Sequence, residues 1–180
     1  MKNINWDNVE EAKGYEKLPA GGYICGITSV EDKPDKEYLT IEFDIAEGEH
    51  KNYYRELYDR KNFWGAHFIK SYKQSAQGFF KKFLLAVEAS NPGFKFNNDE
   101  IALKRKKVGI TIGYEEYVGA DGTIKERIYA DDFLPVDDIK KGNYNIPKLK
   151  KVDDDTYDRV ADNASKKSEE ITADDDLPFS

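Results

Sequence analysis

Aromatic and basic side chains are concentrated in the middle of this 180-residue chain. Ten of the 24 aromatic residues lie between Tyr53 and Phe83, and residues 60–107 hold 11 basic and 3 acidic side chains, a net charge of +8. Flat rings can stack on unpaired nucleobases, while lysine and arginine neutralise phosphates. The middle third therefore has the residue types of a surface for single-stranded nucleic acid.

The candidate binding residues fall into three groups. The first, expected on a strand over residues 51–58 and in the connection after it, comprises Tyr53, Tyr54, Arg55, Tyr58, Arg60, Lys61, Trp64, Lys70, Tyr72 and Lys73. The second is the cationic run Lys104, Arg105, Lys106 and Lys107. The third, Lys125, Arg127 and Tyr129, alternates with Ile124 and Ile128 and so belongs to the opposite side of its strand.

Each group also has a structural interpretation. A small barrel has to be filled, and aromatic residues favour strands, so we assign Phe63, Phe68, Phe79, Phe80 and Phe83 to the core. The run of four cations also suits a solvated entrance to a strand.

The two ends of the chain are acidic. The net charge is −7 in residues 1–59 and −6 in residues 151–180, against −7 for the whole chain and a pI near 5.0. Residues 151–180 contain too few apolar side chains to offset chain entropy, so we predict a disordered tail. Its acidic cluster with a small apolar hook should bind a partner protein through Asp174, Asp175, Asp176, Leu177, Pro178 and Phe179.

Alternating polarity predicts five strands, over residues 23–30, 38–45, 51–58, 108–117 and 123–134. The clearest is residues 38–45, where Leu39, Ile41, Phe43 and Ile45 share one face. Residues 60–73 fit either a helix or an ordered loop. Helical spacing from Ala76 to Val87, with Ser75 as a cap and Asn91 at the end, predicts one helix before the fourth strand.

Three strands, a helix and a hairpin match the order of the OB-fold, a five-stranded Greek-key barrel. We therefore expect a mainly β protein with a short turn or helix over residues 136–141. The expected divisions are an N-terminal arm (residues 1–21), a barrel domain (22–150) and the acidic tail (151–180).

Several classes of protein are disfavoured. The single cysteine, Cys25, excludes an internal disulfide and suits a reducing cytosol, and no apolar run approaches the ~20 residues that cross a bilayer. We expect no cofactor, because no phosphate-binding or dinucleotide motif is present. We expect no metal ion, because His50 and His67 are not at the spacing of a metal-ligand motif. The pairs Asp131-Asp132 and Asp137-Asp138 fit solvated turns better than a hydrolytic metal site.

Several short runs together resemble a family of phage and prophage proteins of Gram-positive hosts, over about residues 18–150. They are Leu-Pro-Ala-Gly-Gly-Tyr at 18–23, Tyr-Leu-Thr-Ile-Glu-Phe-Asp-Ile-Ala-Glu-Gly at 38–48, Phe-Trp-Gly-Ala at 63–66, Ser-Asn-Pro-Gly at 90–93, and Glu-Glu-Tyr at 115–117 before Asp121-Gly122. The resemblance implies a single-stranded DNA-binding OB-fold that acts in replication or recombination in the cytoplasm of the bacterial host.

Residues 174–179 resemble the acidic tip by which bacterial single-stranded DNA-binding proteins recruit helicases, nucleases and recombination mediators. That resemblance implies phage or host replication and recombination proteins as partners. In the bacterial pattern the phenylalanine is the last residue, whereas in this sequence Ser180 follows Phe179.

The sequence thus favours a protein that is not an enzyme and that binds single-stranded DNA without sequence preference, as a monomer or a homo-oligomer. One alternative is an acidic adaptor or inhibitor that occupies a DNA-processing protein without touching DNA. A nuclease that uses the paired aspartates is the third hypothesis.

Overall fold

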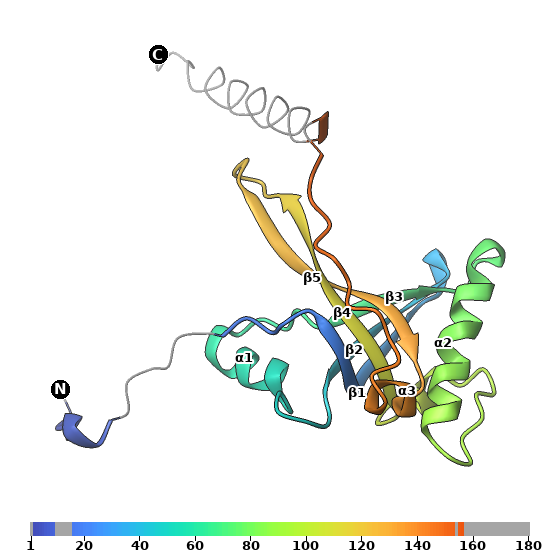
Figure 1. Cartoon of the computed structure of the whole chain (residues 1–180), viewed down its shortest axis with the longest axis horizontal. Coiled ribbons are helices and arrows are strands. Elements are labelled where there is room, and N and C mark those ends of the chain that lie inside the picture. Colours follow the sequence, from blue (N-terminus) through green and yellow to red (C-terminus); the bar gives the residue numbers. More distant parts are fainter. Residues whose placement is uncertain (1, 10–15, 154, 157–180) are drawn as a thin grey trace, which may run out of the picture.

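The computed structural model describes residues 2–9, 16–153 and 155–156, and is mainly β (Figure 1). Its strands are β1 (Gly21–Lys33), β2 (Tyr38–Ile45), β3 (His67–Ser71), β4 (Lys107–Val118) and β5 (Ile124–Leu134). They pair antiparallel in one sheet of order β3-β2-β1-β4-β5. The α-helices are α1 (Tyr53–Lys61), α2 (Gln77–Ser90) and α3 (Val136–Lys140), and 3-10 turns lie at Trp6–Asn8, Pro34–Lys36, Gln74–Ala76 and Glu100–Leu103.

Strand β2 follows the expected alternation. Leu39, Ile41, Phe43 and Ile45 are buried, whereas Tyr38, Thr40 and Glu42 are half-buried on the other face. Asp44 breaks the pattern, since it lies on the polar side of the alternation and is only 7 % exposed. Its carboxylate is buried because it caps a helix.

The expected third strand is wrong. Residues 51–58 lead into and form most of α1, and the third strand is β3, inside the segment expected to be helix or loop. Asp44 explains the helix: Oδ1 accepts hydrogen bonds from the N–H groups of Ile45 (2.8 Å) and Tyr54 (2.9 Å), and Oδ2 from Arg55 (3.1 Å). Two N–H groups of the first helical turn thus find their acceptor on a neighbouring strand.

Helix α2 confirms the helix expected between the third and fourth strands, and α3 confirms the short turn or helix expected over residues 136–141, whereas α1 was not expected. Ser75 is not its cap; the helix follows a 3-10 turn and begins after Ala76 without a side-chain cap. Asn91 ends it, because its amide donates to the carbonyls of Val87 (2.7 Å) and Lys107 (2.8 Å). This second bond also joins the helix to the start of β4.

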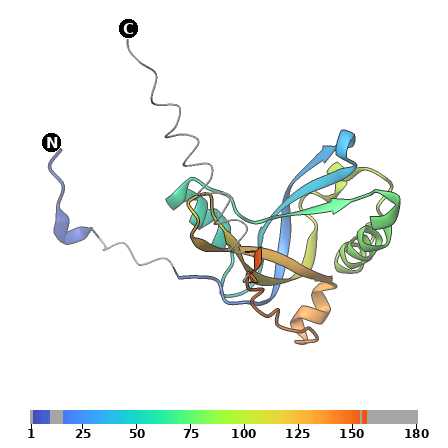
Figure 2. The same ribbon diagram turned by 90° about the horizontal axis from the view of Figure 1, so that it is seen from above.

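Strands β3 and β5 are the two edges of the sheet, and both lie beside α2 (Figure 2). The ring centroids of Phe68 and Phe133 are 4.6 Å apart, and those of Phe83 and Phe133 are 5.2 Å apart. Phe68 and Phe83 are buried as expected and Phe80 packs against the core, but Phe63 and Phe79 are exposed, contrary to expectation. We call this contact between the two edges the seam.

Lys70 lies within the seam. Its Nζ is 3.7 Å from the centroid of the Phe133 ring and 5.7 Å from those of Phe68 and Phe83. Burial lowers the pKa of Lys70 to about 8. The side chain is therefore a partly desolvated cation held against aromatic rings.

Residues 141–150 run back across the outside of β1 and β4. A Cβ at Gly22 would lie 2.6–2.8 Å from the ring of Tyr144, and one at Gly113 would lie 2.7 Å from Pro147 and 2.8 Å from the ring of Tyr129. Only glycine permits so close an approach. The segment is thus part of the packed domain, as is Leu18 in the expected N-terminal arm, which is 1 % exposed.

None of the helices in the described ranges has the length and apolar character needed to cross a bilayer. Cys25 is fully buried, and burial raises its pKa well above the ordinary value.

Replacing Asp44 by alanine should lower the free energy of unfolding by about 1–2 kcal/mol, because two helix N–H groups lose their acceptor. Urea titration followed by far-ultraviolet circular dichroism measures the change. Asp59→Ala is the control, since Asp59 is an exposed carboxylate on the same helix. Equal urea midpoints for wild type and Asp44→Ala would contradict the capping role.

The lowered pKa of Lys70 predicts a pH dependence of stability. Between pH 8 and the unfolded value of 10.5, the unfolded chain binds more protons at this site, so stability should rise with pH. Replacement by methionine should remove this rise and stabilise the protein below pH 8 by about 1–2 kcal/mol, a value discounted for solvent access. Urea titrations at pH 7 and pH 10 test this, with the exposed residue Lys73, replaced by methionine, as the control. If the free energy of unfolding changes with pH in the same way in both variants, the prediction is wrong.

Candidate nucleic-acid interface

The β4–β5 hairpin extends well beyond the other strands as an arm (Figure 1). Strand β1 pairs with β4 only as far as Ile112, whereas β4 and β5 stay paired to Val118 and Ile124. At the tip, Asp121 Oδ1 accepts hydrogen bonds from the N–H (3.1 Å) and hydroxyl (2.7 Å) of Thr123, which lower the pKa of Asp121 to about 2. The arm is therefore an ordered ribbon that ends in a rigid turn.

The C-terminal segment completes one edge of the arm. Lys150 bridges to β4 in parallel: its carbonyl accepts from the N–H of Glu116 (2.8 Å), and its N–H donates to the carbonyl of Tyr114 (3.0 Å). Residues 148–150 thus take the place beside β4 that β1 leaves after Ile112. This pairing adds Lys148 and Lys150 to the arm.

One face of the arm carries alternating rings and cations. The register pairs Tyr117 with Lys125, Glu115 with Arg127 and Gly113 with Tyr129, so these side chains share a side of the ribbon. We define the cationic face as the side formed by Tyr117, Lys125, Arg127, Tyr129, Lys148 and Lys150.

The cations of this face lie over its rings. The Arg127 guanidinium carbon is 5.2 Å from the centroid of the Tyr117 ring, and Lys150 Nζ is 3.5 Å from that of Tyr129. Arg127 also pairs with Glu115 at 2.7 Å, yet its side chain is 62 % exposed. The Tyr129 hydroxyl donates to the carbonyl of Lys148 (3.1 Å), and burial raises the pKa of Tyr129, so the phenol is neutral at physiological pH. Rings and cations are thus held at neighbouring positions.

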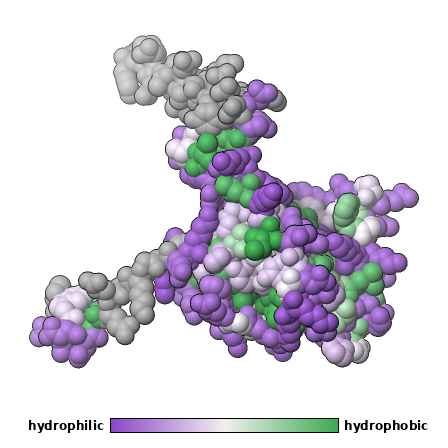
Figure 3. Space-filling view, in the orientation of Figure 1, coloured by the Kyte–Doolittle hydropathy of each residue, from purple (hydrophilic) through white to green (hydrophobic). Residues whose placement is uncertain are grey.

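The other face of the arm is covered by residues 16–18. Lys17 Nζ is 3.9 Å from the centroid of the Tyr114 ring and pairs with Glu126, and the Tyr114 hydroxyl donates to the carbonyl of Leu18 (2.6 Å). The opposite face is therefore the open one at the base of the arm, whereas near the tip Ile124 is 52 % exposed on this face. In the space-filling view, hydrophilic side chains cover most of the visible surface and surround small apolar patches (Figure 3).

A second aromatic group lies at the end of α1 and in the loop after it. Tyr58 and Trp64 have ring centroids 6.1 Å apart, and Phe63 beside them is 66 % exposed. Arg60 and Lys61 are exposed in the last turn of the helix. We call Tyr58, Arg60, Lys61, Phe63 and Trp64 the aromatic corner.

The remaining candidates on α1 are placed differently. Tyr54 is 3 % exposed, so its ring offers no face to a ligand, whereas Arg55 is exposed. The Tyr53 hydroxyl donates to the carbonyl of Glu16 (2.9 Å) and accepts from the N–H of Leu18 (3.0 Å). Tyr53 and Tyr54 thus hold α1 and the N-terminal segment to the sheet.

The run Lys104–Lys107 lies at the far end of β4 from the arm tip. Lys107 pairs with Glu47 at 2.5 Å, and Lys106 Nζ is 4.7 Å from the centroid of the Phe94 ring. Lys104 and Arg105 are exposed in the turn before the strand. Ten residues of extended strand between Lys107 and Tyr117 span roughly 33 Å, so the run and the cationic face form separate surfaces.

Three candidates around the seam, Lys70, Tyr72 and Lys73, belong to neither the cationic face nor the run Lys104–Lys107. Lys70 lies against aromatic rings, and the Tyr72 hydroxyl donates to Asp32 at 2.9 Å, while Lys73 is exposed. The six tail candidates, Asp174 to Phe179, lie outside the described residues, as does most of the tail predicted to be disordered, residues 151–180. Within its described part, the N–H of Val152 donates to the carboxylate of Glu116 (3.1 Å).

The paired aspartates do not converge. Asp132 pairs with Lys82 at 2.5 Å, while Asp137 and Asp138 lie in the first turn of α3. Within the described ranges, no three His, Cys, Asp or Glu side chains gather as they would to hold a metal ion.

Three members of the cationic face, Lys125, Arg127 and Tyr129, were expected from the alternation of β5. Tyr117, Lys148 and Lys150 were missed. Tyr117 had a signal, since it continues the alternation Gly113, Glu115, Tyr117 on the paired strand. The two lysines had none, because their place beside β4 depends on a contact more than 30 residues away in the chain.

Neither a scan of the chain against protein-family models nor a search of curated proteins finds a match. What the cationic face can bind therefore has to be argued from its own geometry and chemistry.

Proposed function

We propose that the chain binds single-stranded DNA without sequence preference, and that the cationic face is its principal contact. The observation that carries the proposal is the alternation of cations and tyrosine rings along the open face of the arm. Cations follow the phosphates of a strand, and rings stack on its bases. Duplex DNA hides its bases in the stack, so this combination favours single strands.

The fold supports the same function. We infer that the sheet closes at the seam into the five-stranded OB-fold barrel, because the order β3-β2-β1-β4-β5 brings the edges β3 and β5 together when it curls. The position of α2 between β3 and β4 also fits that fold. OB-folds bind oligonucleotides with the loop between strands 4 and 5 among their contacts, and here that loop is the tip of the arm.

The aromatic corner is the second part of the proposed interface. Phe63 and Tyr58 are exposed rings next to Arg60 and Lys61, so they repeat the chemistry of the arm. A strand bound to both surfaces would cover more nucleotides than a strand bound to the arm alone.

The acidic tail, residues 151–180, is proposed to recruit phage or host replication and recombination proteins. Asp174, Asp175 and Asp176 would meet a basic partner surface, and Leu177, Pro178 and Phe179 would enter an apolar pocket.

Arg127→Ala should weaken binding to oligo-dT about tenfold, because the arm loses one phosphate contact and the cation over Tyr117. In fluorescence titrations at several salt concentrations, the slope of log affinity against log salt should fall by about 0.7. The control is Lys95→Ala, which removes an exposed lysine paired with Glu88 away from the arm.

An affinity that does not change with salt concentration, or that is equal for duplex and single-stranded DNA, would refute the proposal. A chain that binds no single-stranded DNA at all would instead support the adaptor hypothesis.

Deletion of residues 157–180 removes seven acidic and three basic side chains. If the tail competes with DNA for the cationic face, deletion should tighten binding to oligo-dT at 20 mM salt and change little at 0.5 M, where screening is strong. A variant with a shuffled tail of the same composition separates charge from sequence and should bind DNA as the wild type does. Weaker binding after deletion would exclude the competition.

A further inference from the structure

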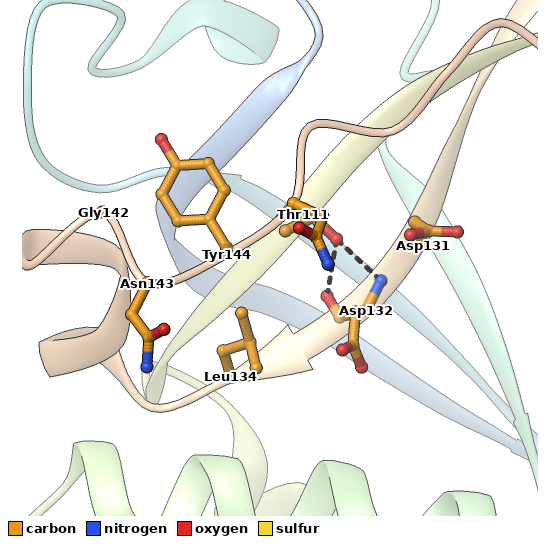
Figure 4. Close-up of a pocket in the computed structure, with 8 residues that line it drawn as sticks. Thr111, Asp131, Asp132, Leu134, Gly142, Asn143 and Tyr144 are labelled. Carbon is orange, nitrogen blue, oxygen red and sulfur yellow. Dashed lines mark hydrogen bonds between the residues drawn. The ribbon is translucent and has the colours of Figure 1, made fainter.

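A pocket of about 330 Å³ opens on the outer side of the sheet, between β4, β5 and residues 142–145 (Figure 4). This volume lies at the lower end of the roughly 300–1,000 Å³ typical of small-ligand sites. Thr111, Leu134, Tyr144 and Asn145 are among its lining residues. The pocket is polar with one aromatic ring, and neither the cationic face nor the aromatic corner includes it.

The ring of Tyr144 is fixed on one side. It packs on the backbone at Gly22, where a Cβ would approach to 2.6–2.8 Å, and Figure 4 shows the ring lying across the ribbon of β1. A ring supported by main chain is a rigid platform that loses little entropy when a flat ligand stacks on it.

A β-bulge supplies the pocket with a carboxylate. Thr111 pairs with Asp132 and the next residue, Ile112, pairs with Ala130, so Asp131 is the extra residue on β5. Bulges of this kind redirect a side chain. Asp131 is exposed and makes no hydrogen bond or ion pair within the part of the chain that the structure describes, whereas Asp132 is held by Lys82 and by the N–H of Phe133 (2.8 Å). Asp131 is therefore the available acceptor.

The charge of the pocket selects against phosphates. Two aspartates line it and no lysine or arginine does, so an anionic group would be repelled. A neutral, flat group with N–H donors fits the combination of a ring, amides and a carboxylate acceptor.

The pocket is continuous with the cationic face. Tyr129 and Asp131 are two residues apart on β5, roughly 7 Å along a strand. Pro147 and the Tyr129 ring both cover Gly113, and the Lys148 carbonyl holds the Tyr129 hydroxyl, so one segment links pocket and face. A strand that follows Lys125, Arg127 and Tyr129 toward the body of the protein reaches the pocket next.

We propose that this pocket receives one unstacked nucleobase that bears an exocyclic amino group, which stacks on Tyr144 and donates a hydrogen bond to Asp131. The inference rests on the proposed single-stranded DNA binding and adds a preference at one position for bases with an exocyclic amino group (cytosine, adenine and guanine) over thymine and uracil. Carboxylates accept hydrogen bonds from the amino group of cytosine, whereas thymine and uracil offer a carbonyl oxygen there, which a carboxylate repels.

The test compares oligo-dC with oligo-dU, because the two bases have the same shape and differ mainly by the exchange of an amino group for a carbonyl. Fluorescence titrations of the full chain should give about tenfold tighter binding to oligo-dC, the lower end of the value of one charge-assisted hydrogen bond. Asp131→Ala should abolish this ratio, and Asp137→Ala, which removes an exposed carboxylate of α3 outside the pocket, should keep it. Loss of a negative charge raises the affinity for both oligonucleotides alike, so the ratio of the two affinities does not contain this general gain.

The ring is tested separately. Tyr144→Leu should weaken binding to both oligonucleotides roughly tenfold, and Tyr144→Phe should bind them as the wild type does. If Tyr144→Leu fails to fold, the Asp131→Ala ratio still decides.

The outcomes separate the two proposals. Equal affinity for oligo-dC and oligo-dU in the wild type, or a ratio that survives in Asp131→Ala, overturns the base pocket and leaves single-stranded DNA binding intact. Failure to bind either oligonucleotide overturns both.

Discussion

The close approach of residues 141–150 to the backbone of β1 and β4 is the contact on which both proposed sites depend. It is possible only because Gly22 and Gly113 have no side chains. Tyr144 rests on the first glycine, and Pro147 and Tyr129 rest on the second. The chain is then aligned so that Lys150 pairs with β4 and places its ammonium over Tyr129. Two glycines thus determine the pocket and the base of the cationic face together.

Local patterns predicted the parts of this protein whose neighbours are local. Strand β2, the β4–β5 hairpin and α2 follow from alternation or helical spacing, and the side of β5 that carries Arg127 follows from Ile128 on the other side. Helix α1 was not predicted by the local pattern of its residues. Its residues Tyr53, Tyr54 and Leu57 suit either a strand or a helical turn, and the acceptor that favours the helix is Asp44, ten residues before Tyr54. A capping motif limited to adjacent residues cannot reveal such a bond.

The candidate site was predicted in part for the same reason. Alternation indicates which residues of a strand share a side, but not which distant segment covers that side. Residues 16–18 close one face of the arm, and residues 148–150 extend the other. The cations of the sequence therefore divide into those that remain open, such as Arg127, and those held against the core, such as Lys70. Net charge by segment could not make this distinction.

An acidic protein can still offer a surface to DNA if its cations are held in place before binding. Ordering a lysine or arginine side chain on a phosphate costs roughly 0.5–1.5 kcal/mol of conformational entropy. On the arm, Arg127 already lies over Tyr117 and Lys150 over Tyr129, so part of that ordering occurs on folding. Glu115 has a double effect, because it orients Arg127 but also competes with a phosphate for it. The pairing is exposed, where ion pairs contribute little, so a phosphodiester, whose single negative charge is shared by two oxygens, can displace it when several cations lie nearby. Under the proposed function, the arm is therefore expected to favour a polyanion that contacts several of its cations at once over a single small anion.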